Sequence, residues 1–510
     1  MRKLSLVSAI LMVGVVPFAA VACGGDDDEA DKPKATGGTG GGGTGGTDGG
    51  ASGGASGSGA TGGGGTGGGA TGGTAGQGGG ASGGTAGQGG SSGSATGGTA
   101  GQGGSGGGGP TCDITGAGKA KQTVSGDITA NTTWTSDKVW QLSGTVHVNA
   151  GVTLTIEPCT RIEGLNSPLG LLIVKPGGKL MADGTKDEPI LFTSANAPGS
   201  RAAGDWGGVV ILGNATANYA GGGTADFEAL PGETFGGSNA ANDTESSGTL
   251  RYVRIEFAGK EVAPDKEVNG LSFAGVGSGT VVDYVMVSNV TDDCFEWFGG
   301  TANATHLVCF KNDDDMFDVD TGYRGKLQFL YGKSTGSTES LNALESGDDK
   351  DNNTRTPETA ATVYNMTVCL EGAVGAKKRY GAAFRGGSKG EVVNSAFLDY
   401  VEGGLFLVHF PTDTTPGTTA PTLHHSVAFT KVAGAPVGSP QAAIDLWNAG
   451  TGNSTTDPGI NCADVMPAPN AMIAGATPPA GFDTSAAYVG AFKDKTDTWM
   501  SGAWVEFAEN

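Results

Sequence analysis

Basic residues are scarce in this chain. Lys and Arg number 30 among 510 residues, against 52 Asp and Glu, which gives a formal net charge of −22 at pH 7. Such a chain has no basic surface with which to displace the counterions of nucleic-acid phosphates, so we exclude a nucleic-acid partner. The same charge argues against electrostatic attachment to anionic lipid. After Cys23, no apolar run is long enough to span a bilayer.

Histidine and cysteine are also few, and neither has metal-binding spacing. The 5 histidines form no His-x-x-x-His or Glu-x-x-His pattern, and no Cys-x-x-Cys pair is present. The usual zinc motifs are therefore absent. Six cysteines follow Cys23, and in an exported protein they allow 15 pairings. One or two disulfides and mostly buried thiols fit the sequence equally well. These cysteines are Cys112, Cys159, Cys294, Cys309, Cys369 and Cys462.

Residues 1–22 have the pattern of a signal peptide. Arg2 and Lys3 precede an apolar stretch that ends in small residues directly before Cys23, too short and wrongly flanked for a transmembrane helix. Small residues followed by Cys resemble the lipobox of bacterial lipoproteins, so we expect cleavage after residue 22 and acylation of Cys23. Gly24, rather than Asp, resembles lipoproteins sorted to the outer membrane. We therefore expect a lipid anchor in that membrane, on its periplasmic or extracellular face.

Glycine is what the chain has in abundance, with 97 residues. Most of residues 24–110 is Gly, Ala, Ser, Thr and Gln, and the hexamer Thr-Ala-Gly-Gln-Gly-Gly begins at Thr74, Thr85 and Thr99. With almost no apolar side chains, this stretch cannot offset its conformational entropy. We predict that residues 23–110 form a disordered tether behind the lipidated Cys23, with a root-mean-square reach of roughly 50 Å.

Residues 111–480 consist of short β-rich runs separated by Gly, Asn and Asp. No stretch carries a sustained 3.6-residue apolar period, so we expect few helices. The next 30 residues, 481–510, include Trp499 and Trp504. Because an open end of stacked strands is a sheet edge that can pair with another molecule, we predict that this segment caps the end of the stack.

Two of the runs recur at one spacing. Residues 293–296 return in kind as 315–318, and 285–287 return as 307–309, each 22 positions later. A period in the twenties with one or two short strands per copy is typical of a solenoid, in which each coil buries its apolar face on its neighbours. A β-sandwich or jelly roll of similar strand count is the alternative. The identical spacing favours the parallel solenoid.

Several motifs resemble those of a family of secreted or lipid-anchored bacterial proteins, over essentially all of residues 115–510. The resemblance implies an all-β fold, a right-handed parallel β-helix, and a place at the cell surface, but no settled activity. One departure is Cys159, where the family usually has Gly. The motifs are Thr153 to Pro158 (TLTIEP), Asp205 to Gly213 (DWGGVVILG), Asp292 to Gly300 (DDCFEWFGG), Gly322 to Phe329 (GYRGKLQF), and Tyr488 to Phe492 (YVGAF) with Trp499 and Trp504.

The densest group of chemically active side chains is acidic. In a 22-residue register, Asp293 lies over Asp315 on the next coil, with Phe295 and Phe317 stacked inside. Like charges this close raise each other's pKa unless a cation lies between them, and Ca²⁺ takes six to eight oxygen ligands. Solvated turns are the equally weighted alternative. The candidate calcium ligands are Asp292, Asp293, Glu296, Asp313, Asp314, Asp315, Asp318 and Asp320.

A catalytic function for the same coils is the less favoured interpretation. Parallel β-helices include polysaccharide lyases and hydrolases, and the Asp-Asp-Cys run resembles a polygalacturonase motif. The Gly-His-Gly and Arg-Ile-Lys elements that accompany that motif are absent, and His306 stands in Thr-His-Leu instead. A calcium-dependent lyase needs a basic residue near its metal, for which Arg324 and Lys326 are candidates. We expect both to pair with neighbouring carboxylates.

Together these observations predict an outer-membrane lipoprotein whose β-helix binds polysaccharide or other cells, with calcium bridging adjacent coils. The alternative is an enzyme, a calcium-dependent polysaccharide lyase or a glycoside hydrolase, on the same acidic coils. A passive stalk is a third interpretation. We predict no catalytic residue.

Overall fold

The computed structural model describes residues 112–219, 223–227, 230–263, 266–335, 341–348, 355–371, 379–399, 406–408, 421–429 and 441–508. The predicted signal peptide, Cys23 and the tether lie outside the described residues. Among the residues described, no helix is both long enough and apolar enough to cross a membrane.

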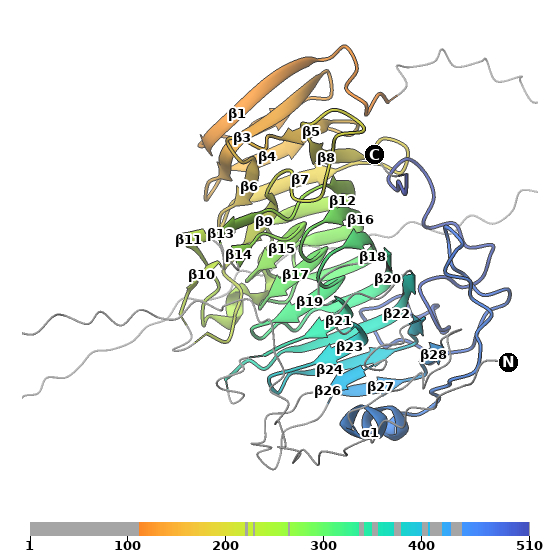
Figure 1. Cartoon of the computed structure of the whole chain (residues 1–510). Helices are drawn as coiled ribbons and strands as arrows, with labels where there is room; N and C mark the ends of the chain where they lie inside the picture. The colour runs from red at the N-terminus through yellow and green to blue at the C-terminus, as the bar shows by residue number, and fades with distance from the viewer. Residues whose placement is uncertain are drawn as a thin grey trace, which may run out of the picture. The chain divides into compact units, whose positions relative to one another are not determined.

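The described strands stack in parallel as a β-helix with three faces (Figure 1), which confirms the predicted fold class. The longest strands bend around a corner and so belong to two faces each. β3 (Lys138–Val148) runs from the second face to the third. Five others run from the first face to the second: β12 (Gly248–Glu256), β16 (Val281–Val290), β18 (Asn303–Asn312), β20 (Lys326–Thr335) and β22 (Ala360–Glu371).

The shorter strands complete each face. The first face adds β2 (Thr132–Trp134), β4 (Thr153–Ile156), β7 (Lys179–Asp183), β24 (Lys389–Val393) and β27 (Thr422–His424). The second adds β1 (Ala120–Ile128), β5 (Arg161–Gly164), β8 (Ile190–Ser194), β25 (Ala396–Leu398) and β28 (Val427–Phe429). The third adds β6 (Leu171–Val174), β9 (Gly208–Leu212), β15 (Leu271–Ala274), β17 (Phe295–Phe298), β19 (Phe317–Asp320), β21 (Leu341–Ser346), β23 (Arg379–Phe384) and β26 (Phe406–Val408).

Among the described residues, four strands and two short helices lie outside the three faces. Two antiparallel hairpins, β10 (Ala225–Phe227) with β11 (Leu230–Phe235) and β13 (Glu261–Ala263) with β14 (Lys266–Glu267), project from the third-face side. The helices are η2, a 3₁₀ turn over Ala240–Thr244, and α1 (Gln441–Ala449). The expectation of few helices is confirmed for the described residues.

The 22-residue register is confirmed by the strand pairing. Val285 lies beside Leu307 in the pair β16–β18, and Phe295 lies beside Phe317 in β17–β19. The rings of Phe295 and Phe317 are buried and stacked, with centroids 5.6 Å apart. The interior is therefore built from aligned apolar side chains of successive coils, as the repeat predicted.

Aromatic residues close both ends of the core. At the β2 end, Trp134 and Trp140 stack with centroids 5.3 Å apart. At the other end, α1 lies against β26 and β27 (Figure 1), and its Ala443 and Trp447 belong to the same buried cluster as Leu423 of β27. The end of the stack is thus covered by a short amphipathic helix.

The corner between the first and second faces carries a column of residues with left-handed backbone conformation, the corner column. The rings of its first four members stack in order: Tyr252 on Tyr284 at 4.5 Å, Tyr284 on His306 at 4.1 Å, and His306 on Phe329 at 4.8 Å. The corner needs a positive φ in each coil, and stacking of rings on neighbouring coils offsets part of that backbone cost. The column comprises Tyr252, Tyr284, His306, Phe329, Asn365, Asn394 and His425.

The prediction of an end cap at residues 481–510 is corrected by the structure. The segment returns along the corner column: Asn365 Nδ2 donates to the carbonyls of Ala486 and Tyr488, at 3.1 and 2.6 Å. Farther on, Trp504 packs edge-on against Tyr284 at 5.4 Å, and the carbonyl of Ala503 accepts a hydrogen bond from Arg254 Nη1 of β12 at 3.1 Å. The described part of the segment covers a flank because the rings exposed at the corner offer it apolar partners.

The structure pairs all six cysteines that follow Cys23. The disulfides are Cys112–Cys159, Cys294–Cys309 and Cys369–Cys462, whose partners are 47, 15 and 93 positions apart in the chain. Cys159 has φ of +64°, a conformation that favours glycine. The chain therefore has a cross-linked residue at a position whose backbone favours glycine.

Candidate metal centre

Four aligned residues at the turn into the third face form a column of amide and carboxyl side chains. They are Asn269, Asp293, Asp315 and Asn342, each 4% exposed or less. Asp293 Oδ1 accepts from the backbone N–H of Asp315 at 2.7 Å, and Asp315 Oδ1 accepts from that of Asn342 at 2.6 Å. The buried backbone N–H groups of Asp315 and Asn342 are thus each satisfied by a carboxylate of the preceding coil. We call this the turn column.

A second column runs beside it on the outer side of the third face. Glu296 lies beside Asp318, and Asp318 lies beside Glu345, on the paired strands β17, β19 and β21. The asparagines of the turn column hold the two glutamates: Asn269 Nδ2 donates to Glu296, and Asn342 Nδ2 donates to Glu345 Oε2 at 2.8 Å. The strand column therefore brings three carboxylates from successive coils next to the buried acids.

Carboxylate oxygens of the two columns come together in three overlapping groups, each within 4.8 Å. Six of the eight residues predicted as ligands take part. Among the described residues, neither Asp313 nor Asp320 belongs to these groups. Glu345 takes part but was not predicted, because Asn342 follows Asp315 by 27 residues instead of 22. The groups are Asp292, Asp293 and Asp314; Asp293, Glu296 and Asp318; and Asp315, Asp318 and Glu345.

Burial and mutual repulsion act strongly on the two acids of the turn column. Removal from water raises the pKa of Asp293 well above its ordinary value, and the charges of Asp292, Asp315 and Glu296 raise it further. The pKa of Asp315 is likewise raised, first by burial and then by Glu345. Because buried like charges cannot all ionise at low cost, these acids require either protons or a cation.

One cation of the chain itself adjoins the acids. Arg385, directly after β23, places Nη1 2.8 Å from Glu345 Oε1. Burial lowers the pKa of Arg385, but the charges of Glu345, Asp315 and Asp318 outweigh that effect and raise it. This guanidinium remains protonated and neutralises the Glu345 end of the strand column. No regular spacing relates Arg385 to the predicted ligands, so sequence reasoning did not identify it.

The two basic residues named from the sequence lie elsewhere. Arg324 Nη2 pairs with Asp243 Oδ2 at 2.9 Å, so it does bind a carboxylate, but one from the insertion that contains η2. Lys326 Nζ donates to the carbonyl of Ala480 at 3.3 Å, and the expectation that it pairs with a carboxylate near the acidic coils is corrected. Neither residue serves the columns.

The donor set fits a hard cation. The three groups supply only carboxylate oxygens, without His or Cys, and such ligands suit Ca²⁺, Mg²⁺ or Mn²⁺ rather than zinc. The two asparagines add a second sign. Asn269 and Asn342 are each 1% exposed, and the amide Oδ1 of each is buried without a hydrogen-bond partner. Amide oxygens are also calcium ligands, so the site is chemically suited to that ion.

Comparison with known proteins agrees with the geometry of the coils. The family described as a pectate-lyase like beta helix domain matches residues 126–454. This range begins within β1 and ends beyond α1, and therefore includes the acidic columns. No curated protein and no solved structure matches the chain.

Proposed function

The chain belongs to the family of pectate-lyase-like beta-helix domains, and on this premise we propose that it is a lipid-anchored surface protein that binds polysaccharide or other cells. In this proposal Cys23 carries the lipid, the Gly-rich segment is the tether, and the β-helix is the binding domain. The membrane is the outer membrane, as Gly24 directly after Cys23 suggests. Calcium bridges adjacent coils through the turn and strand columns.

One observation carries the calcium part of the proposal. Coils that are hydrogen-bonded neighbours contribute carboxylates of Asp293, Glu296 and Asp318 to a single group within 4.8 Å. An ion held there neutralises charges that otherwise repel across the β17–β19 pair, so it stabilises the register of the coils as well as the turn. Asp292, Asp314, Asp315 and Glu345 extend the ligand set to either side.

A calcium-dependent lyase is the second candidate, because Arg385 lies beside the carboxylates of a pectate-lyase-like fold. The ion pair with Glu345 argues against Arg385 as a proton acceptor, since the raised pKa keeps its guanidinium charged. A glycoside hydrolase has less support. The Gly-His-Gly and Arg-Ile-Lys elements that accompany the Asp-Asp-Cys motif in polygalacturonases are absent from this chain. Binding is therefore the favoured function.

The test is thermal unfolding of the mature chain in calcium and in excess EGTA, with magnesium as a second ion. Asp293→Asn with Asp315→Asn is the informative variant, because Asn already occupies both neighbouring positions of the turn column. Asp313→Asn with Asp320→Asn removes the same charge outside the groups and is the matched control. We expect calcium to raise the melting temperature of the native chain and of the control but not of the informative variant.

Polysaccharide retention is then measured with calcium present. Anionic and neutral polysaccharides are immobilised and the native chain is compared with the same two variants. Retention without loss of polymer length supports a binding function, whereas calcium-dependent formation of unsaturated sugar products establishes the lyase. If neither the melting temperature nor retention responds to calcium, the metal is rejected and the columns are structural.

A further inference from the structure

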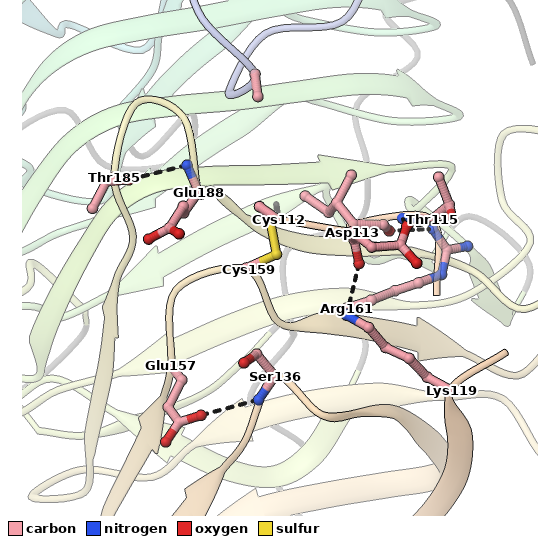
Figure 2. Close-up of a disulfide and its surroundings, with 12 residues drawn as sticks. Cys112, Asp113, Thr115, Lys119, Ser136, Glu157, Cys159, Arg161, Thr185 and Glu188 are labelled. Atoms are coloured by element: carbon pink, nitrogen blue, oxygen red, sulfur yellow. Dashed lines mark hydrogen bonds between the residues drawn. A yellow bond between two sulfur atoms is a disulfide. The ribbon is translucent and has the colours of Figure 1, made fainter. Parts of the chain in front are cut away.

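The disulfide Cys112–Cys159 joins the first described residue of the chain to the turn between β4 and β5. Its partners are 47 positions apart, and the covalent loop encloses β1, β2, β3 and β4. Figure 2 shows the bridge between the segment at Cys112 and the turn that follows Glu157. Residues 23–111, the predicted tether, precede Cys112 directly in the chain.

The turn that holds Cys159 is firmly attached to later coils. The backbone N–H of Cys159 donates to the carbonyls of Glu188 and Pro189, at 3.2 Å each. Two residues farther on, Arg161 is buried, and its Nη1 donates to the Ile114 carbonyl at 3.4 Å. Beyond this turn the chain enters β5, which is hydrogen-bonded to β3 on one side and to β8 on the other.

The strand nearest the tether is the opposite case. β1 is paired with β3 alone among the described strands, and seven of its nine residues are exposed. With hydrogen bonds to one neighbouring strand and few buried side chains, β1 is the strand that we expect a load at Cys112 to detach first. Strands with few buried contacts are also the first to open spontaneously.

We propose that the Cys112–Cys159 bridge is a load-transfer link that carries tension from the tether past residues 113–158 into the turn before β5. This inference rests on the proposed anchorage at Cys23, because only an anchored protein that holds a partner is under tension. The force follows the shortest covalent path, from Cys112 through the two sulfurs to Cys159. The edge strand β1 and the three strands after it then bear no load, and the core end at Trp134 stays covered.

The bridge also stabilises the folded protein by restricting the unfolded chain. A stability measurement therefore does not test the proposal, and the readout must be extension under force. We suggest optical-tweezer stretching of the full mature chain between one handle in the Gly-rich segment and one at the exposed Ser200. The other two disulfides lie outside the loaded residues and serve as internal controls.

The same molecule is stretched before and after addition of a phosphine reductant. In the oxidised state we expect no extension from residues 113–158 before the coils at β5 and β8 open. In the reduced state we expect an additional low-force step of up to about 160 Å, because 47 released residues span about 3.4 Å each. Cys112→Ser with Cys159→Ser should show this step without reductant, and Cys294→Ser with Cys309→Ser should not.

Two results overturn the proposal. One is a reduced protein whose first step is no longer than that of the oxidised protein. The other is an oxidised protein that already releases about 160 Å at low force. Comparing one molecule in both redox states keeps the test valid if the serine variant does not fold. Mass spectrometry of Cys23 tests the anchor separately, so an unlipidated Cys23 refutes the proposed location and leaves the stretching result unchanged.

Discussion

Two of the disulfides offer a controlled measurement of what cross-linking contributes to this fold. Cys369–Cys462 joins β22 to the residues that follow α1, and its partners are 93 positions apart. The partners of Cys294–Cys309 are only 15 positions apart. All four cysteines are 2% exposed or less, so replacement by Ala removes similar buried surface from each pair. The two double variants therefore differ chiefly in the length of the loop that becomes unrestricted in the unfolded chain.

Loop length sets the expected cost of each variant. The chain-entropy relation gives about 4.6 kcal/mol for the 93-residue loop and about 3.0 kcal/mol for the 15-residue loop. We expect Cys369→Ala with Cys462→Ala to lower the free energy of unfolding by about 1.6 kcal/mol more than Cys294→Ala with Cys309→Ala. The residues around Cys462 should also become accessible to proteases in the first variant only, because they lose their covalent attachment to β22.

The assay is urea unfolding of both variants and of the native chain, followed by tryptophan fluorescence at one calcium concentration. Midpoints are converted to free energies with a common slope, provided that the slopes agree. Equal costs, or a larger cost for the 15-residue loop, would refute the reasoning. Either result would mean that these bridges act through strain or packing in the folded protein and not through the unfolded chain.

Two further predictions concern the C-terminal segment and the acidic columns. Trp504→Ala removes a fully buried ring that packs on Tyr284. We expect it to lower the free energy of unfolding, measured in urea, by about 3–5 kcal/mol. A loss below about 1 kcal/mol would show that the segment covers the corner without this ring. In EGTA, Asp293 and Asp315 have folded pKa values above the ordinary 3.8, so the folded state binds their protons more tightly than the unfolded state does. Their stabilising contribution is full below about pH 4 and declines as pH rises through the folded pKa values; Asp→Asn at both positions should flatten this decline in melting curves, and an unchanged pH profile would contradict the assignment.

The repeat in the sequence was sufficient to predict the register of the central coils. Because one turn from β16 to β18 takes 22 residues without insertion, equal spacing in the chain becomes direct contact in space. The stacking of Phe295 on Phe317 and the placement of Asp293 beside Asp315 follow from that spacing. The family resemblance and the β-rich texture predicted the same fold class, which the structure confirms.

Partners that lie across insertions could not be predicted in this way. Glu345 and Arg385 join the acidic columns although the coils that carry them are longer than 22 residues. Arg324 pairs with Asp243, which precedes it by 81 positions and stands in an insertion. In each case the side chains meet because the coils are stacked, while their separation in the chain depends on loop lengths that follow no period.

Local patterns in the sequence by themselves determined the coil, its repeat and the alignment of its central carboxyl groups. The lipid anchor and the tether also rest on sequence patterns and remain predictions, since they lie outside the described residues. Only the tertiary structure decided the three disulfide pairs, the covering of the corner column by the C-terminal segment, and the counter-charge from Arg385. A periodic pattern specifies contacts between neighbouring coils, whereas these contacts join residues far apart in the chain and depend on the stacked shape itself.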